Sequence, residues 1–317
     1  MKTKIFFIKL VALVLSLWIA SQILARTLDK VFVKDRSQKE LWTLSQHDLS
    51  VGYVVAGDSR AFNTIDARTL EIRTGQPSIN VGFGGQGAIE MYLTLYLFLQ
   101  HENHVRNVIL QIDGADLDDS LKFQTYLYMP YMADPEVAAT VRDVLGLKRY
   151  AVLKAFPLAK YWEYNNFYGL ERLQNSRSAL SPYDQSAGSE LLYDENYHEF
   201  PGTPTDPNFV IDSRSRGYLD RIVQLTRSRG VNLTMFSSPV YHHNGMFLKY
   251  DEAFRSYMAR YCQERGIPYL DFSDAKFDPS EFRDYGHLNG RGALRFTAML
   301  ADSLLALSKD RSSSAGK

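Results

Sequence analysis

Cysteine is nearly absent from this sequence, which contains one in 317 residues. That single cysteine, Cys262, excludes an intramolecular disulfide framework and a zinc site built from cysteines. We interpret it as a small buried residue on a helix. No internal repeat is visible. The remaining composition, with 45% hydrophobic and 23% charged residues, is that of a globular chain long enough to bury a substantial core.

Net charge is also missing, because 36 lysine and arginine residues balance 36 aspartate and glutamate residues. Five of the basic groups precede residue 31, so residues 31–317 carry 31 basic and 35 acidic groups. A body with a slight negative excess lacks the basic surface that nucleic acids require. Nucleic acid is therefore excluded as a partner.

The N-terminus carries a long apolar segment, Ile5 to Ala25, interrupted only by Lys9. At about 1.5 Å per residue it reaches roughly 31 Å, which crosses a bilayer if Lys9 extends toward the membrane surface. Three lysines at its start predict a cytoplasmic N-terminus and a body on the other side. The small-residue cleavage site is weak, so we expect residues 1–30 to be an uncleaved anchor with a short cytoplasmic stub. A cleaved signal peptide is the alternative.

Strand-like and helix-like segments alternate along the rest of the chain, after a stalk helix expected within residues 26–49. Short apolar runs typical of buried parallel strands are followed by longer helical stretches. The expected strands are Val51–Ala56, Ser78–Val81, Val108–Ile112, Val231–Phe236 and Pro268–Phe272. The expected helices are Ala88–Gln100, Ser213–Arg229, Tyr250–Arg265 and Gly292–Leu307. This alternation predicts a three-layer α/β fold around a parallel sheet.

A long insertion separates the third and fourth expected strands, from about residue 116 to 212. It contains a helical piece, Pro135–Phe156, and an aromatic-rich piece, Tyr161–Leu170. An ordinary crossover needs about a dozen residues, so we expect the insertion to form a lid or substrate platform at the carboxyl edge of the sheet. The sequence thus predicts one domain, residues 31–307, and a disordered tail, residues 308–317.

Two short motifs carry the residue types of nucleophilic acyl transfer. The first is Gly57-Asp58-Ser59, directly after the first expected strand, where a serine is exposed at the edge of the sheet. The second runs from Asp284 to His287, directly before the last expected helix. There a carboxylate can hold the imidazole while the other ring nitrogen faces a nucleophile. Together they predict Ser59 as nucleophile, His287 as general base and Asp284 as the orienting carboxylate.

These motifs resemble those of the SGNH, or GDSL-like, hydrolase superfamily, whose members place the serine near the N-terminus and Asp-x-x-His near the C-terminus. The resemblance covers most of the expected domain, except the insertion, and implies the SGNH-hydrolase fold. The segment from Asn80 to Gly85 is similar to the family's second block, which supplies a glycine N–H to the oxyanion hole. It implies an oxyanion hole made by the N–H groups of Ser59 and Gly85, with Gly82 as the next candidate and Asn80 as a support.

The third block departs from the family, in which many members carry an asparagine side chain in the oxyanion hole. Here the third strand is followed by Asp113 and Asp116, and a carboxylate would repel an oxyanion. Together with the N-terminal segment, this departure resembles a membrane-anchored branch that acts on bacterial envelope polymers. That branch includes the D-alanyl transfer protein of teichoic acid systems and alginate O-acetylation proteins.

Other polar residues near the motifs have less specific interpretations. We expect Asp58 to bond to the backbone of its turn and Asn289 to cap the last helix. Arg60 is a candidate ligand for a substrate carboxylate or phosphate, with a surface salt bridge as the alternative. The pair His242-His243 has no carboxylate or third histidine beside it in the sequence, so we expect no metal and no cofactor.

An aromatic cluster in the insertion is either a platform that stacks on sugar rings or part of the insertion's own core. Its members are Tyr161, Trp162, Tyr164 and Tyr168.

The motifs and the anchor together predict an extracytoplasmic serine acyl-transfer enzyme held at the membrane by one helix, periplasmic in a Gram-negative cell. The expected activity is O-acetyl or O-acyl transfer to an extracytoplasmic or exported polysaccharide, with a multi-span membrane acyltransferase as candidate partner. Two alternatives remain open. One is a carbohydrate or lipid esterase with the same triad, and the other is a non-catalytic assembly factor for polymer modification.

Overall fold

The computed structural model describes residues 2–117, 123–163, 181–193, 211–241, 248–284 and 286–315. The chain divides into two compact units. The first comprises Met1–Ser45 and Gln124–Ser181, and the second comprises Gln46–Phe123 and Pro182–Lys317. This division differs from the expected anchor, single domain and insertion, because the first part of the insertion belongs to the same unit as the N-terminal helix.

The second unit is built on a five-stranded parallel sheet in the order β2-β1-β3-β4-β5. The strands are β1 (Ser50–Ala56), β2 (Ser78–Asn80), β3 (His104–Gln111), β4 (Asn232–Ser237) and β5 (Tyr269–Asp271). Each lies within a few residues of the apolar run that predicted it. Because all strands point the same way, their carboxyl ends meet along one edge. The order places β1, which leads to Ser59, in the interior of the sheet beside β3.

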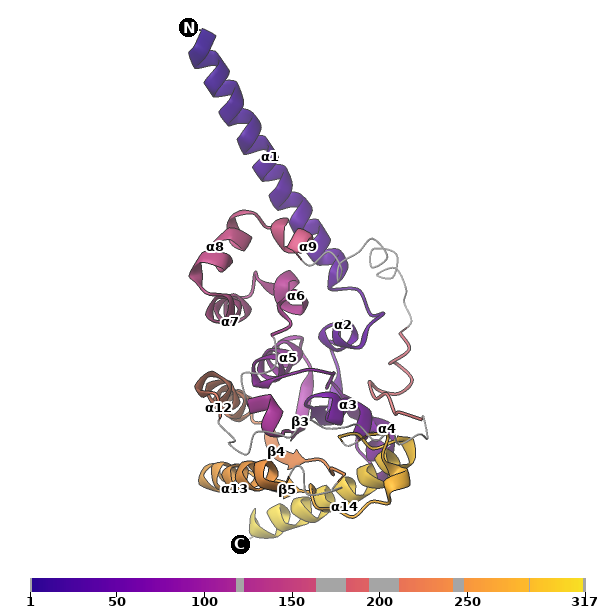
Figure 1. Ribbon diagram of the computed structural model, residues 1–317. Helices are drawn as coiled ribbons and strands as arrows, with labels where there is room; N and C mark the ends of the chain where they lie inside the picture. Colours follow the sequence, from indigo (N-terminus) through magenta and orange to yellow (C-terminus); the bar gives the residue numbers. More distant parts are fainter. Residues whose placement is uncertain are drawn as a thin grey trace. The chain divides into compact units, whose positions relative to one another are not determined.

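Helices cover both faces of this sheet (Figure 1). They are α3 (Ser59–Thr64), α4 (Ala67–Thr74), α5 (Ala88–Gln100), α12 (Ser213–Ser228), α13 (Leu248–Arg265) and α14 (Gly290–Ala315). Alternate side chains of a strand point to opposite faces. Tyr53 and Val55 of β1 accordingly join one core cluster with Phe296 and Leu300 of α14, whereas Val54, also buried, is outside it. The three-layer α/β prediction is confirmed.

Cys262 lies on α13 with 1% of its surface exposed, which confirms its interpretation as a buried helix residue. The C-terminal tail differs from expectation, because α14 continues past Leu307 to Ala315. Residues 308–315 contain neither proline nor glycine, and the Ser308 hydroxyl bonds to the Leu305 carbonyl 2.8 Å away. A helix already formed propagates through such residues without a new nucleation step.

The first unit is helical in its described part. Its helices are α1 (Lys2–Phe32), α2 (Lys39–Leu44), α6 (Thr125–Tyr128), α7 (Pro135–Leu145), α8 (Leu147–Ala155) and α9 (Ala159–Glu163), with a 3₁₀ turn over Met129–Tyr131. The single helix expected over Pro135–Phe156 is broken at Gly146, whose φ of 78° ends α7. Among the described residues, α1 is the one helix long and apolar enough to cross a membrane, with a mean hydropathy of 2.1. Figure 1 shows its N-terminal half projecting beyond α8 and α9.

Candidate active site

Ser59 is the first residue of α3 and follows β1 after a two-residue turn. Gly57 makes this turn with a φ of 142°, and a Cβ there would lie only 2.7 Å from the Gln111 Oε1 atom. Asp58 caps α3 by accepting a hydrogen bond from the Arg60 N–H at 2.7 Å, as expected. The turn therefore places the Ser59 side chain at the carboxyl edge of the sheet.

His287 lies beside this serine, although 228 residues separate them in the chain. Its Nε2 atom is 2.8 Å from Ser59 Oγ, and its Nδ1 atom is 2.9 Å from Asp284 Oδ1 and 3.1 Å from Oδ2. An ionised carboxylate only accepts hydrogen bonds, so Nδ1 carries the proton and Nε2 is left to accept the Ser59 hydroxyl proton. The structure thus brings the three residues of the two motifs into one hydrogen-bonded chain.

Hydrogen bonds within the loop hold Asp284 and His287 in place. Asp284 Oδ1 also accepts the N–H groups of Gly286 at 2.8 Å and His287 at 2.9 Å. Burial pushes the pKa of Asp284 upward, but these bonds and the neighbouring imidazole outweigh it, so the pKa lies below its ordinary value. Asn289 caps α14, as expected, and its Oδ1 accepts the Gly292 N–H at 3.2 Å.

The glycine-rich loop after β2 corrects one expected oxyanion donor. The Gly82 N–H donates to Asn80 Oδ1 at 3.0 Å, and Gly82 is buried, so it cannot serve an oxyanion. Asn80 also donates to the Ala61 and Ile65 carbonyls, which ties the loop to α3. The sequence could not show that the Asn80 side chain turns back on its own loop.

Gly85 and Ser59 remain the candidate residues whose backbone N–H groups would donate to an oxyanion. It is exposed, and its φ of 73° suits a glycine. Gly84, which sequence analysis did not single out, lies beside the nucleophile, since a Cβ on it would be 3.9 Å from the Ser59 Cβ. The exposed loop therefore borders Ser59 at Gly84, the residue directly before Gly85.

Behind Ser59 lies a cluster of three carboxylates that sequence analysis did not assemble: Asp58, Asp113 and Asp116. Each contributes an oxygen within 4.8 Å of the others. Burial, and then the charge of Asp113, raises the pKa of Asp58 to about 7 and that of Asp116 well above its ordinary value. Arg60 Nη1 lies 3.3 Å from Asp113 Oδ2, so this arginine forms an internal ion pair. Arg60 and retained protons thus offset the negative charge of this cluster.

Gln111 connects this cluster to the nucleophile turn. It is fully buried at the end of β3, its Oε1 accepts the Asp58 N–H at 3.1 Å, and its Nε2 donates to Asp113 Oδ2 at 3.1 Å. Asp113 is one of the two carboxylates after the third strand that sequence analysis noted. Asp113 therefore accepts a hydrogen bond from Gln111, and Gln111 in turn holds the turn that precedes Ser59.

Of the four aromatic candidates of the insertion, Tyr161 is the one whose side chain lies within the described residues. The Tyr161 ring stacks on Phe32 with 5.3 Å between centroids, and its hydroxyl bonds to Asp29, both on α1. These contacts give Tyr161 a structural role within the first unit. The side chain of Trp162 and all of Tyr164 and Tyr168 lie outside the described residues, as does the histidine pair at 242 and 243.

Tyr193 is an exposed aromatic residue that sequence analysis missed. Its side chain is 72% exposed, and a Cβ on Gly290 would lie 2.7 Å from the ring. Gly290 follows His287 by three residues, and its N–H donates to the Leu192 carbonyl at 2.7 Å. Tyr193 lines two open hollows, of about 490 and 410 Å³. Among the described aromatic residues it is therefore a candidate for contact with a substrate ring.

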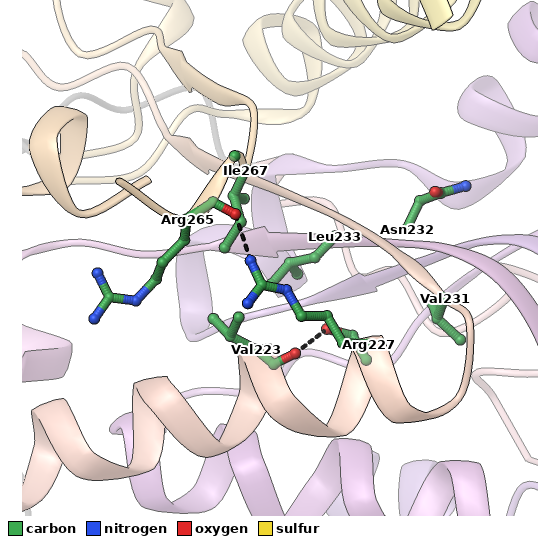
Figure 2. Close-up of a pocket in the computed structure, with 9 residues that line it drawn as sticks. Val223, Arg227, Val231, Asn232, Leu233, Arg265 and Ile267 are labelled. Atoms are coloured by element: carbon green, nitrogen blue, oxygen red, sulfur yellow. Dashed lines mark hydrogen bonds between the residues drawn. The ribbon is translucent and has the colours of Figure 1, made fainter. Parts of the chain in front are cut away.

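Another hollow, of about 270 Å³, lies at the other edge of the sheet (Figure 2). It is lined by residues of α12, including Val223 and Arg227, and by Leu233 at the start of β4. The Arg227 guanidinium donates to the backbone carbonyl of Arg265 there. Since the triad lies at the carboxyl ends of the strands, this hollow is not part of the candidate active site.

No family model matches this chain, and no curated protein matches it. Several solved structures do. A candidate acylhydrolase from Bacteroides fragilis has 10% identity and a TM-score of 0.41, covering 81% of this chain and 86% of that one. A candidate lipolytic protein of the G-D-S-L family from Desulfitobacterium hafniense has 13% identity and a TM-score of 0.41, covering 79% and 98%. A GDSL-like lipase from Bacteroides thetaiotaomicron has 9% identity and a TM-score of 0.38, covering 81% and 88%.

Two of these three structures carry the G-D-S-L name that the sequence motifs suggested. The contacts among Ser59, His287 and Asp284 are what indicate its chemistry.

Proposed function

We propose that this protein is a serine-dependent acyl-transfer enzyme. The observation that carries the proposal is the continuous chain from Ser59 Oγ to His287 Nε2 at 2.8 Å and from His287 Nδ1 to Asp284 at 2.9 Å. Nucleophile, base and orienting carboxylate within hydrogen-bond distance are the arrangement that activates a serine hydroxyl. The intact chain disfavours the alternative of a non-catalytic assembly factor.

The reaction has two steps. His287 takes the hydroxyl proton as Ser59 Oγ attacks the acyl carbonyl carbon, and Asp284 stabilises the resulting imidazolium. The N–H groups of Ser59 and Gly85 are the proposed donors to the oxyanion. His287 then protonates the leaving group, which yields the acyl-enzyme. In the second step His287 takes the proton of the incoming hydroxyl as its oxygen attacks the acyl carbonyl carbon. His287 then gives that proton to Ser59 Oγ as the bond between Ser59 and the acyl group breaks, which releases the new ester and restores the free serine.

We further propose that the incoming hydroxyl belongs to an extracytoplasmic or exported polysaccharide, so that the protein is an O-acyltransferase. The apolar α1 helix supports this choice, since a membrane-bound partner could deliver the acyl group at the membrane that α1 would span. A carbohydrate or lipid esterase with the same triad is the alternative.

The nucleophile is tested by labelling the full chain with a fluorophosphonate probe. We expect wild type to be labelled and Ser59→Ala to lose labelling, with a change in unfolding free energy of no more than about 1 kcal/mol. Ser303→Ala on α14 is the matched control and should label like wild type. Equal labelling of wild type and Ser59→Ala would remove Ser59 as the nucleophile.

The choice between transfer and hydrolysis is tested with p-nitrophenyl acetate, with and without oligosaccharide acceptors. We expect slow hydrolysis alone, faster release with an acceptor, and an acylated acceptor in the mass spectrum. Tyr193→Ala should reduce transfer more than hydrolysis, whereas Tyr193→Phe, which keeps the ring, should preserve transfer. Fast hydrolysis without any acylated sugar across several envelope-type acceptors would favour the esterase.

A further inference from the structure

Helix α8 of the first unit exposes an unusual amount of apolar surface. Leu147 is 70% exposed, Val152 is 54% exposed, and Phe156, just after the helix, is 61% exposed. Leu147, Ala151 and Ala155 are spaced by four residues and so lie along one stripe of the helix, and Lys148 lies between this stripe and Val152. Leu153, in contrast, is buried, with 3% of its surface exposed.

The position of α8 is fixed by contacts with α1 in the same unit. The carbonyl of Ala155 accepts hydrogen bonds from Trp18 Nε1 at 2.8 Å and from Gln22 Nε2 at 3.3 Å. The Lys160 ammonium of α9 pairs with Asp29, which lies farther along α1, at 2.5 Å. The end of α8 therefore lies at the level of Trp18 to Gln22, within the apolar segment of α1.

If α1 is retained in a membrane, its length indicates that lipid surrounds the helix from Trp18 to Gln22. Residues 5–17, which precede the contact with α8, span only about 20 Å, whereas the hydrocarbon core is about 30 Å thick. About 10 Å of the core must therefore be matched by residues from Trp18 onward. Lys9 cannot change this conclusion, because starting the span after it shortens the free part further.

The charges of α8 complement the surface of a bilayer. Lys148, Arg149 and Lys154 are exposed on the helix, and none of its nine residues is acidic. Long basic side chains can place their apolar stems along acyl chains and their charged ends among headgroups. Interfacial helices combine such basic residues with an apolar face buried about 5–10 Å into the boundary.

We propose that α8 lies in the polar–apolar boundary of the membrane that α1 spans, with its apolar stripe against acyl chains and its basic side chains among anionic lipid headgroups. This proposal goes beyond the enzymatic function and depends on retention of α1 in the membrane. It explains why Leu147, Val152 and Phe156 are exposed next to an apolar helix. In this proposal both α1 and α8 of the first unit contact lipid.

The test places an environment-sensitive fluorophore on single cysteines in the full chain, reconstituted in nanodiscs of phosphatidylcholine and phosphatidylglycerol. Leu147→Cys and Val152→Cys report on α8, and Val14→Cys reports on α1. Native Cys262 is buried and does not compete for the label. The controls are Asp143→Cys, an exposed polar position on α7, and Ile72→Cys, an aliphatic residue 80% exposed on α4.

We expect blue-shifted emission at positions 147 and 152, with quenching by a shallow nitroxide lipid roughly twofold or more above both controls. Replacing phosphatidylglycerol by phosphatidylcholine should reduce that quenching. Position 14, near the middle of the apolar segment, is read with a nitroxide placed deep on the acyl chain. Deep quenching at position 14 with control-level shallow quenching at 147 and 152 would overturn the proposal while leaving the anchor intact. A blue shift at 147 and 152 without shallow quenching would also overturn it, because it would indicate a protein partner on α8. Absence of deep quenching at position 14 would overturn the anchor itself, independently of the fluorophosphonate result at Ser59.

Discussion

Asp284 keeps its negative charge although it is half-buried beside the imidazole. Two backbone N–H groups and the His287 ring donate to it, and this set lowers its pKa against the effect of burial. The negative charge of Asp284 keeps the proton on Nδ1 of His287 and so leaves Nε2 to accept the hydroxyl proton of Ser59. The protonation state of one carboxylate thus decides whether the serine has a base.

Replacing Asp284 by asparagine tests this point. An amide can present its N–H₂ group to Nδ1, which favours the wrong tautomer, so we expect acyl-enzyme formation to slow by about 10⁴-fold with little change in fold. Pre-steady-state release of p-nitrophenol measures the rate. Asp302→Asn, at an exposed position on α14, is the control and should leave the rate unchanged. A loss below tenfold in Asp284→Asn would show that Asp284 does not orient the histidine.

Asp58 should make the stability of the protein depend on pH. Its pKa is raised from 3.8 to about 7 in the folded chain, so the folded state binds the proton more tightly than the unfolded state. Stability is then greatest at low pH and is lost as the pH rises from about 4 to about 7. Because Asn also caps helices well, Asp58→Asn should remove that loss and be more stable above pH 7 by on the order of 2–4 kcal/mol.

Urea unfolding of wild type and Asp58→Asn between pH 4 and pH 8 measures the difference. Asp66→Asn, at the residue that caps α4, controls for the change of cap. Parallel curves for wild type and Asp58→Asn across this range would contradict the prediction.

At the scale of elements, the turn between β1 and α3 is the most constrained connection at the site. Gly57 has a positive φ and is packed against the Gln111 side chain and the Ala61 Cβ atom. Gln111 in turn holds the Asp58 N–H from β3. The position of Ser59 therefore depends on packing between two neighbouring strands as well as on the turn itself.

Gly57→Ala should disrupt this connection, because its Cβ would overlap Gln111 and its φ is unfavourable for alanine. We expect a loss of at least about 2 kcal/mol of stability together with lost fluorophosphonate labelling. Gly75→Ala is the matched variant, since Gly75 has a φ of 68° but nothing within 4 Å of an added Cβ. It should cost about 1 kcal/mol and keep labelling. Similar effects of both variants would show that contact with Gln111 is unimportant.

At the scale of the whole molecule, the candidate active site and the candidate membrane helix belong to different units. The parallel sheet of the second unit brings the ends of β1, β2 and β3 and the loop before α14 to the candidate active site. The first unit carries α1, which has the length and composition to cross a membrane. A site on one unit and an anchor candidate on the other are consistent with an enzyme that works at a membrane surface.

The lysines near the N-terminus predict the orientation of the chain in a membrane. With lysines before the apolar run, we expect a reporter fused after Lys317 to be active only outside the cytoplasm, and the protein to sediment with membranes without being shortened. Reversing the charge of Lys2, Lys4 and Lys9 together should weaken this orientation. A reporter active only in the cytoplasm would contradict the topology, and release of a shortened protein would contradict the anchor.

The sequence by itself determined the parts of the protein that depend on local patterns. Apolar runs predicted all five strands, and two short motifs selected Ser59, Asp284 and His287, which the structure brings within hydrogen-bond distance. These predictions succeed because strand periodicity and turn chemistry depend on neighbours in the chain.

Only the tertiary structure decided which groups meet across long separations. It assigned the Gly82 N–H to Asn80, joined Asp58 to Asp113 and Asp116, and placed Tyr161 against α1. A donor's partner and the pKa of a carboxylate depend on burial and on charges from distant segments. That is why the two motifs of the candidate active site could be found in the sequence, whereas the groups that surround them could not.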